Sequence, residues 1–234
     1  DVYKRQIQGG AMYEDTQLTG NSLTPRIAVN YLINPRHGLR AVYSEAIRSP
    51  DMFENNVNWS YRVTGLSTPV YGQNSAQYFV KTRGPGNLDQ EHMRSRELGY
   101  NGYFVDQALN LDIKLFYDEI TGMISEPLRN NQYIASNSNA SRFAGTESQL
   151  DWQLSRADRL RLTYAYVHAQ ASNRLDQRLT ASNSGSAGWL RNWGQGWSSA
   201  LFYYGDSALN GYRFERVDTR IAKRLALGLS LIHI

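Results

Sequence analysis

The chain has 234 residues, of which 41% are hydrophobic, and a formal net charge of +4. It contains no run of about 18 apolar residues, so a membrane-spanning helix is excluded. The absence of cysteine excludes disulfides and thiolate metal sites, and the basic residues are too scattered to indicate nucleic-acid binding. Sixteen tyrosines and five tryptophans are many for this length, and such residues form girdles at both interfaces of membrane β-barrels.

The two ends of the chain are related through their coding sequences. The first six residues, DVYKRQ, can be encoded by GATGTGTATAAGAGACAG, and the reverse complement of that sequence encodes the last six, LSLIHI. We therefore expect residues 1–6 and 229–234 to be translated sequencing-adapter sequence, and we exclude them from the prediction of the fold. We expect the remaining residues, 7–228, to lack the beginning and the end of the natural gene.

Alternation of apolar and polar residues predicts a chain built mainly of β-strands, about ten in number. In chain order, the predicted strands are 7–14, 26–34, 39–46, 96–105, 109–119, 145–154, 160–166, 189–193, 197–204 and 216–227. The long polar stretch 48–94 has room for a further hairpin that includes 76–82.

The clearest alternation lies in segment 109–119, LNLDIKLFYDE. One predicted face carries Leu109, Leu111, Ile113, Leu115 and Tyr117, and the other carries Asn110, Asp112, Lys114, Phe116 and Asp118. Only Phe116 departs from the pattern. Such a strand fits the half-buried sheet of a soluble protein, and it fits equally a membrane barrel with lipid outside and water inside.

The lengths of the connections favour the barrel. Short turns are predicted near Pro35, Gln107, Ala157 and Gln195, and longer polar segments lie between them. In an up-and-down sheet this places every short turn on one rim and the long loops on the other, as in bacterial outer-membrane barrels. The predicted fold class is therefore all-β, an antiparallel up-and-down transmembrane β-barrel, present here as an incomplete segment.

Several short motifs lie on these strands in a characteristic order. They are LTPRIA at 23–28, IRSP at 47–50, RELGY at 96–100, LFYDEI at 115–120, GTE at 145–147 and VDTRIAKR at 217–224. In this order they resemble the C-terminal barrel strands of the TonB-dependent outer-membrane receptors. The resemblance covers about residues 7–228, and we expect the plug domain, the TonB box and the last strands of that family to lie outside this segment.

The resemblance implies a fragment of an active importer in the bacterial outer membrane. Family members bind a scarce ligand, often a ferric siderophore, and are energised by the TonB complex, which would act through the missing N-terminal part. Membrane lipid would cover the outside of the barrel. Ten strands cannot close a barrel of about 22 strands, so we do not expect this segment to transport alone.

Two alternatives stay open. A passive porin-type barrel would lack the IRSP and RELGY motifs and an N-terminal plug. A soluble β-rich binding domain would pack its apolar faces on each other and would carry loops of mixed length on both rims.

The segment 48–94 supplies the candidate ligand-binding residues, because it mixes cations with aromatic rings. They are Arg48, Trp59, Tyr61, Arg62, Tyr71, Tyr78 and Arg83. Ferric siderophore complexes are often anionic, and arginine suits them by charge and by stacking. The alternative is that these are ordinary loop residues or girdle aromatics, with Arg48 structural at the junction of strand and loop.

We predict neither an enzyme nor a resident metal or cofactor. His37, His92 and His168 lie far apart and show no metal-ligand spacing. Asp112 and Asp118 fall on the predicted wet face of a strand, where carboxylates line water more simply than they act as an acid–base pair.

Overall fold

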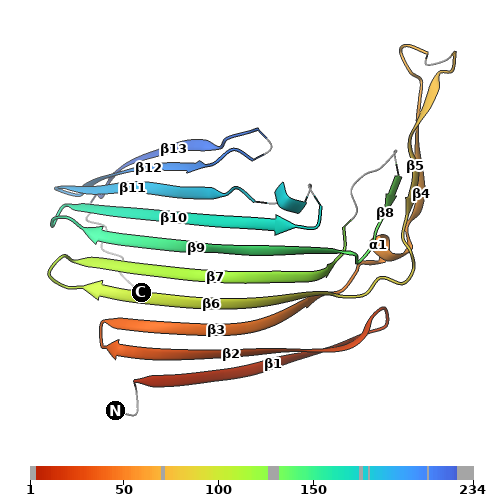
Figure 1. Cartoon of the computed structure of the whole chain (residues 1–234). Helices are drawn as coiled ribbons and strands as arrows, with labels where there is room; N and C mark the ends of the chain where they lie inside the picture. The colour runs from red at the N-terminus through yellow and green to blue at the C-terminus, as the bar shows by residue number, and fades with distance from the viewer. Residues whose placement is uncertain are drawn as a thin grey trace, which may run out of the picture.

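The computed structural model describes residues 4–69, 72–125, 132–173, 176–178, 180–209 and 211–225. Strands dominate these residues (Figure 1). The elements are β1 (Arg5–Thr16), β2 (Gly20–Asn34), β3 (His37–Arg48), α1 (Met52–Asn56), β4 (Asn58–Thr64), β5 (Ser75–Arg83), β6 (Glu91–Phe104), β7 (Leu109–Met123), β8 (Gln132–Ile134), β9 (Asn139–Gln153), β10 (Asp158–Ala171), the 3-10 helix η1 (Asp176–Arg178), β11 (Asn183–Gly194), β12 (Trp197–Asp206) and β13 (Glu215–Lys223).

Ten of the strands form one sheet in the order β1-β2-β3-β6-β7-β9-β10-β11-β12-β13. Every neighbouring pair in this sheet is antiparallel. Figure 1 shows these strands side by side as one open wall, with β1 and β13 at its edges. The predicted up-and-down sheet of about ten strands is therefore confirmed.

The two ends of the wall differ in their connections. At one end, which we call the short-turn rim, the strands are joined by residues 35–36, 105–108, 154–157 and 195–196. At the other end, the long-loop rim, the connections are 49–90, 124–138, 172–182 and 207–214, with the three-residue turn 17–19 as the exception. Gln195 and Gly196 have φ angles of 49° and 80°, which are the two positive values that a tight type I′ hairpin turn needs.

Most strands are longer than predicted, and most of the extra residues lie toward the long-loop rim. The last strand is an exception, because β13 ends at Lys223 whereas the prediction continued to 227. β2, β7 and β9 have 15 residues each, and β6 and β10 have 14. A tilted membrane-spanning strand needs only about 9–11 residues. The strands therefore continue their pairing beyond the length that a hydrocarbon layer requires.

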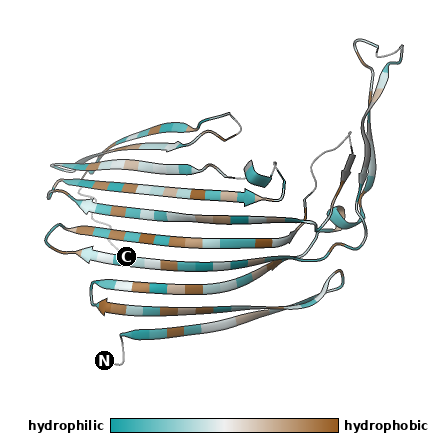
Figure 2. Cartoon of the chain, in the orientation of Figure 1, coloured by the Kyte–Doolittle hydropathy of each residue, from teal (hydrophilic) through white to brown (hydrophobic). Residues whose placement is uncertain are grey.

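Pairing sorts the side chains of the wall into two faces, and Figure 2 shows the alternation along the strands. On the polar face, Asp112 lies between Asn101 and Gln149, and Lys114 lies opposite Glu147. On the apolar face, a cross-strand row runs through Leu111, Leu150, Leu162, Ala187, Tyr203 and Val217.

Burial is inverted relative to a soluble sheet. Large residues of the apolar face are open to the surroundings, with exposed fractions of 61% for Leu98, 53% for Leu115 and 62% for Val217. Small residues of the polar face, such as Ala28 and Val42, are buried. Within the part of the chain that the structure describes, the buried hydrophobic cluster lies at the long-loop rim and consists of Leu88, Ile124 and Ala135. Because nothing among these residues packs on the apolar face, it fits lipid as its neighbour.

Aromatic side chains of the apolar face gather near both rims. Trp152, Trp189, Trp193 and Trp197 lie toward the short-turn rim, and Tyr43, Tyr117, Tyr166 and Tyr203 lie toward the long-loop rim. Two such girdles flanking an apolar band are typical of a membrane barrel. Among the described residues, no helix has the length and apolarity needed to cross a membrane.

Two phenylalanines on the polar face cover glycines of the neighbouring strand. Phe116 lies opposite Gly145, where an added Cβ would come within 2.8 Å of the ring. Phe202 lies opposite Gly188, where an added Cβ would overlap the ring. A ring laid over a cross-strand glycine supports sheet register and curvature. This explains why Phe116 departs from the alternation of its strand.

Candidate functional site

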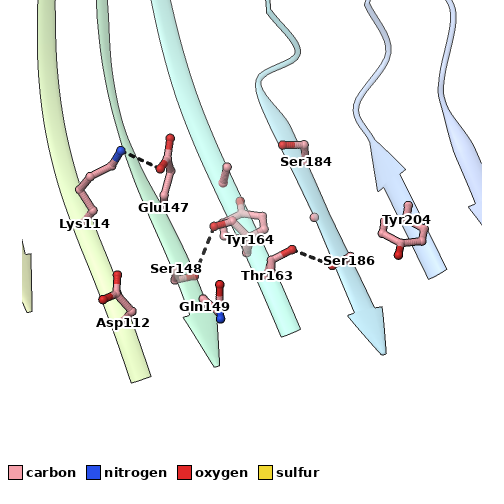
Figure 3. Close-up of a pocket in the computed structure, with 12 residues that line it drawn as sticks. Asp112, Lys114, Glu147, Ser148, Gln149, Thr163, Tyr164, Ser184, Ser186 and Tyr204 are labelled. Atoms are coloured by element: carbon pink, nitrogen blue, oxygen red, sulfur yellow. Dashed lines mark hydrogen bonds and ion pairs between the residues drawn. The ribbon is translucent and has the colours of Figure 1, made fainter. Parts of the chain in front are cut away.

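An open hollow of ≈ 600 Å³ lies on the polar face over β7, β9, β10 and β11 (Figure 3). Lys114 Nζ lies 2.7 Å from Glu147 Oε2, and the hydroxyls of Thr163 and Ser186 are 2.7 Å apart. Charge in this hollow is thus nearly balanced, and hydroxyl and amide groups complete its lining. The surface suits water or polar protein groups. The described residues contain no group of three or more His, Cys, Asp or Glu that could hold a metal ion.

The long-loop rim carries a denser set of interactions, which we call the loop-base network: Arg48, Glu54 and Glu91. Arg48 Nε and Nη2 each donate to one oxygen of Glu91 at 2.8 Å. Arg48 Nη1 also lies 3.0 Å from Glu54 Oε2. The backbone N–H of Ile124 donates to Glu91 Oε1 at 2.7 Å. The network therefore joins the end of β3, the start of β6 and the end of β7 to α1.

The electrostatics of this network favour its charged form. Partial burial acts to raise the pKa of the Glu91 carboxyl, but the hydrogen bonds from Arg48 and Ile124 outweigh it, and the pKa is lowered. The hydrogen bond to Glu91 raises the pKa of the Arg48 guanidinium in turn. Glu91 and Arg48 thus remain an ion pair over the physiological range.

Helix α1 is fixed by local chemistry at the start of the loop. Asp51 and Glu54 form a capping box, in which each side chain accepts from the other residue's backbone N–H. The chain then returns over the helix, where Leu88 N–H donates to the buried Asn55 Oδ1 at 3.0 Å. Gly84 lies so close to the backbone of Asn55 that a Cβ there would overlap it. The base of the 49–90 loop is therefore closely packed.

Two long loops are joined beyond this base. β4 pairs antiparallel with β5, and β8, from the loop between β7 and β9, pairs parallel with β5. Asn137 strengthens this junction, because its Nδ2 donates to the carbonyls of Asp89 and Gly122 at 2.9 and 2.8 Å. Figure 1 shows β4 and β5 projecting away from the long-loop rim.

The predicted ligand-binding residues fall into two places. Trp59, Arg62 and Arg83 lie on the projecting β4–β5 hairpin, and all three are exposed. Tyr61 and Tyr78 belong to the same two strands, but their side chains lie outside the described residues, as does the whole of Tyr71. Arg48 lies apart from the hairpin, with its guanidinium held by two carboxylates.

Sequence reasoning did not identify Glu54, Glu91 or Asn137 as partners at the loop base. The Asp51–Glu54 spacing is a signal that could have predicted the helix start. Asn137 carried no comparable signal, because its role depends on three backbone groups that only the fold brings together.

An antiparallel wall with one polar face, and with an apolar face on which none of the described residues packs, defines a segment of a membrane β-barrel. The chain matches the family described as TonB dependent receptor-like, beta-barrel, over residues 4–230, and it belongs to that family. The comparison with curated proteins gives no match.

Solved siderophore receptors share the fold. The siderophore receptor PirA of Pseudomonas aeruginosa aligns with a TM-score of 0.69 at 13% identity, covering 95% of this chain and 37% of that one. The ferric enterobactin receptor of the same organism aligns with a TM-score of 0.67 at 15% identity, covering 88% and 30%. The ferric-catecholate import receptor Fiu of E. coli aligns with a TM-score of 0.60 at 13% identity, covering 88% and 29%. The chain thus spans about a third of the length of these structures.

Proposed function

We propose that this chain is part of the wall of a bacterial outer-membrane importer that captures a scarce anionic ligand, of the ferric siderophore type, at its long-loop rim. The whole importer would be energised through TonB by a part of the protein beyond this segment, and membrane lipid would cover the apolar face. Residues 1–6 and 229–234 would be adapter-derived and take no part in this function.

The observation that carries the proposal is the projecting β4–β5 hairpin. It presents Trp59, Arg62 and Arg83 to the surroundings, while the loop-base network and Asn137 hold its base. Arginine binds planar anions by charge and paired hydrogen bonds, and an indole ring stacks on aromatic ligands. A related solved receptor, the ferric enterobactin receptor, has been crystallised in complex with enterobactin, which is consistent with an anionic iron complex as ligand.

Uptake of a ferric tricatecholate complex by cells that produce the receptor containing this segment tests the proposal. The triple variant Trp59→Ala, Arg62→Gln, Arg83→Gln should weaken binding by about tenfold or more, since each residue would contribute on the order of 1 kcal/mol. Arg213→Gln is the matched control, because Arg213 is an exposed arginine between β12 and β13 that is paired with Glu215. Uptake that persists after the proton gradient is abolished would favour the passive porin instead.

A further inference from the structure

A second hollow, of ≈ 880 Å³, lies at the opposite end of the wall, on the polar face at the short-turn rim. We call it the rim hollow. It extends from the turn between β9 and β10 across β11 and β12 to β13. In the part of the chain that the structure describes, its lining contains no Asp or Glu but six cationic residues, namely Arg156, Arg159, Arg191, Arg220, Lys223 and Arg224. Two of them, Arg191 and Lys223, belong by register to the apolar face, where they lie over the rings of Trp193 and Trp197.

Three of these six cations have a partner nearby, either a carboxylate or a backbone carbonyl. Asp151 pairs with Arg159 at 2.9 Å, and Asp158 pairs with Arg191 at 3.3 Å. Lys223 donates to the carbonyl of Gln195 at 2.6 Å.

Three guanidinium groups remain, those of Arg156, Arg220 and Arg224. All three are exposed, and none of them has an ion pair among the described residues. The rim hollow therefore keeps a surplus of positive charge.

The strand register fixes the position of one of these three, Arg220, relative to the residues at the bottom of the hollow. Arg159 and Arg220 stand at the two ends of a cross-strand row, with Leu190 and Ala200 between them. Ser198 and Ala222 form the next pair toward the rim. Because strands are ~4.8 Å apart and the intervening residues are mostly small, arginine side chains from both sides can reach a group at the bottom of the hollow.

Several cations elsewhere on the wall are paired with carboxylates. In the central hollow Lys114 is paired with Glu147. At the long-loop rim Arg48, Arg94 and Arg142 are paired with Glu91, Glu45 and Glu119. The rim hollow differs from these places because no carboxylate belongs to its described lining.

We propose that the rim hollow is a second ligand site, which takes a small molecule carrying two or more oxyanion groups, phosphate or carboxylate. Guanidinium groups bind such oxygens through charge-assisted, often paired hydrogen bonds. The volume falls in the range of small-molecule pockets, about 300–1,000 Å³. The site lies at the other end of the strands from the β4–β5 hairpin, so it does not depend on which ligand that hairpin captures.

The test is calorimetric titration of the receptor that contains this segment, in detergent micelles, with inorganic pyrophosphate and, separately, with citrate. Saturable binding of either anion is expected. The double variant Arg220→Gln, Arg224→Gln should weaken it by about tenfold or more, because it removes two charge-assisted contacts. Arg216→Gln is the matched control, since Arg216 lies on the polar face of the same strand but is paired with Asp218 at 3.0 Å. Far-UV circular dichroism verifies that each variant keeps its β content.

Three results would overturn the proposal. One is the absence of saturable binding of both anions to the folded receptor. Another is equal weakening by Arg216→Gln, which would show a general charge effect. The third is competition by phosphatidylglycerol added to the micelles, which would move the site to the membrane surface. The hairpin variant should still bind both anions at the rim hollow, whatever its effect on uptake of the iron complex. The two proposals can therefore fail independently of each other.

Discussion

Arg48 and Glu91 form a two-pronged ion pair at the top of the β3–β6 pair, with Nε and Nη2 each 2.8 Å from a carboxylate oxygen. The pair holds the two ends of the 49–90 loop together, because Arg48 is the last residue of β3 and Glu91 is the first of β6. A long loop whose ends are pinned in this way can present its tip in a fixed direction.

Removing the pair should loosen the loop base without unfolding the wall. Glu91→Gln removes the charge that Arg48 binds, and we expect a local cost of about 1–2 kcal/mol, since Arg48 is half exposed. Amide hydrogen exchange within residues 84–91 should become about tenfold faster or more, while β9 and β10 keep their protection. Glu215→Gln, in an exposed pair with Arg213, is the control and should change little.

The same pair predicts a pH dependence. The pKa of Glu91 is lowered in the folded protein, so its stabilisation is complete above the unfolded value of about 4.3. It is lost as the pH falls through the lowered folded value. Protection of residues 84–91 should therefore decline in acid, and Glu91→Gln should remove that part of the decline. A loop base that stayed equally protected down to pH 2 would contradict the assignment.

The two faces of β7 should tolerate substitution differently. Leu115→Arg places a charge on the apolar face and should cost about 2–4 kcal/mol near the middle of a bilayer. Asp112→Asn, on the polar face beside Asn101, should have a small effect. Unfolding of each variant from lipid vesicles by urea gives the two free energies, and equal costs would argue against a lipid-facing surface.

The covered glycines should be intolerant of larger residues. Gly188→Ala would drive its Cβ into the Phe202 ring, and we expect a loss of about 1–3 kcal/mol from the displaced side chain. Gly10→Ala is the matched control, because nothing lies within 4 Å of a Cβ at that strand position. Similar urea midpoints for the two variants would show that the position of the Phe202 ring does not require a glycine at 188.

The sequence predicted the wall well where lipid and water impose alternation. The start of β7 at Leu109 and the turn at Gln195 are examples, and both lie near the short-turn rim. At the long-loop rim, the strands extend further than the sequence predicted. β9 begins at Asn139 rather than near Gly145, because beyond the membrane both faces are wet and pairing continues without a hydrophobic pattern.

The candidate site was less predictable, for a physical reason. Trp59, Arg62 and Arg83 could be chosen by residue type, but their common hairpin depends on the β4–β5 pairing. The partners of Arg48 come from positions 54 and 91, which only the folded loop base brings together. The surplus charge of the rim hollow likewise comes from a turn, a strand and a strand end that only the fold brings together, and no local motif of the sequence predicts it.

The most direct test of the membrane-wall assignment uses the absence of native cysteine. Single cysteines at 111, 112, 113, 114 and 115, in the receptor that contains this segment, can be spin-labelled in lipid bilayers. Oxygen, which dissolves in lipid, should then enhance the relaxation of spin labels at 111, 113 and 115. A water-soluble nickel complex should enhance the relaxation of labels at 112 and 114. Access of the nickel complex to all five positions, or to 111, 113 and 115 alone, would contradict the account.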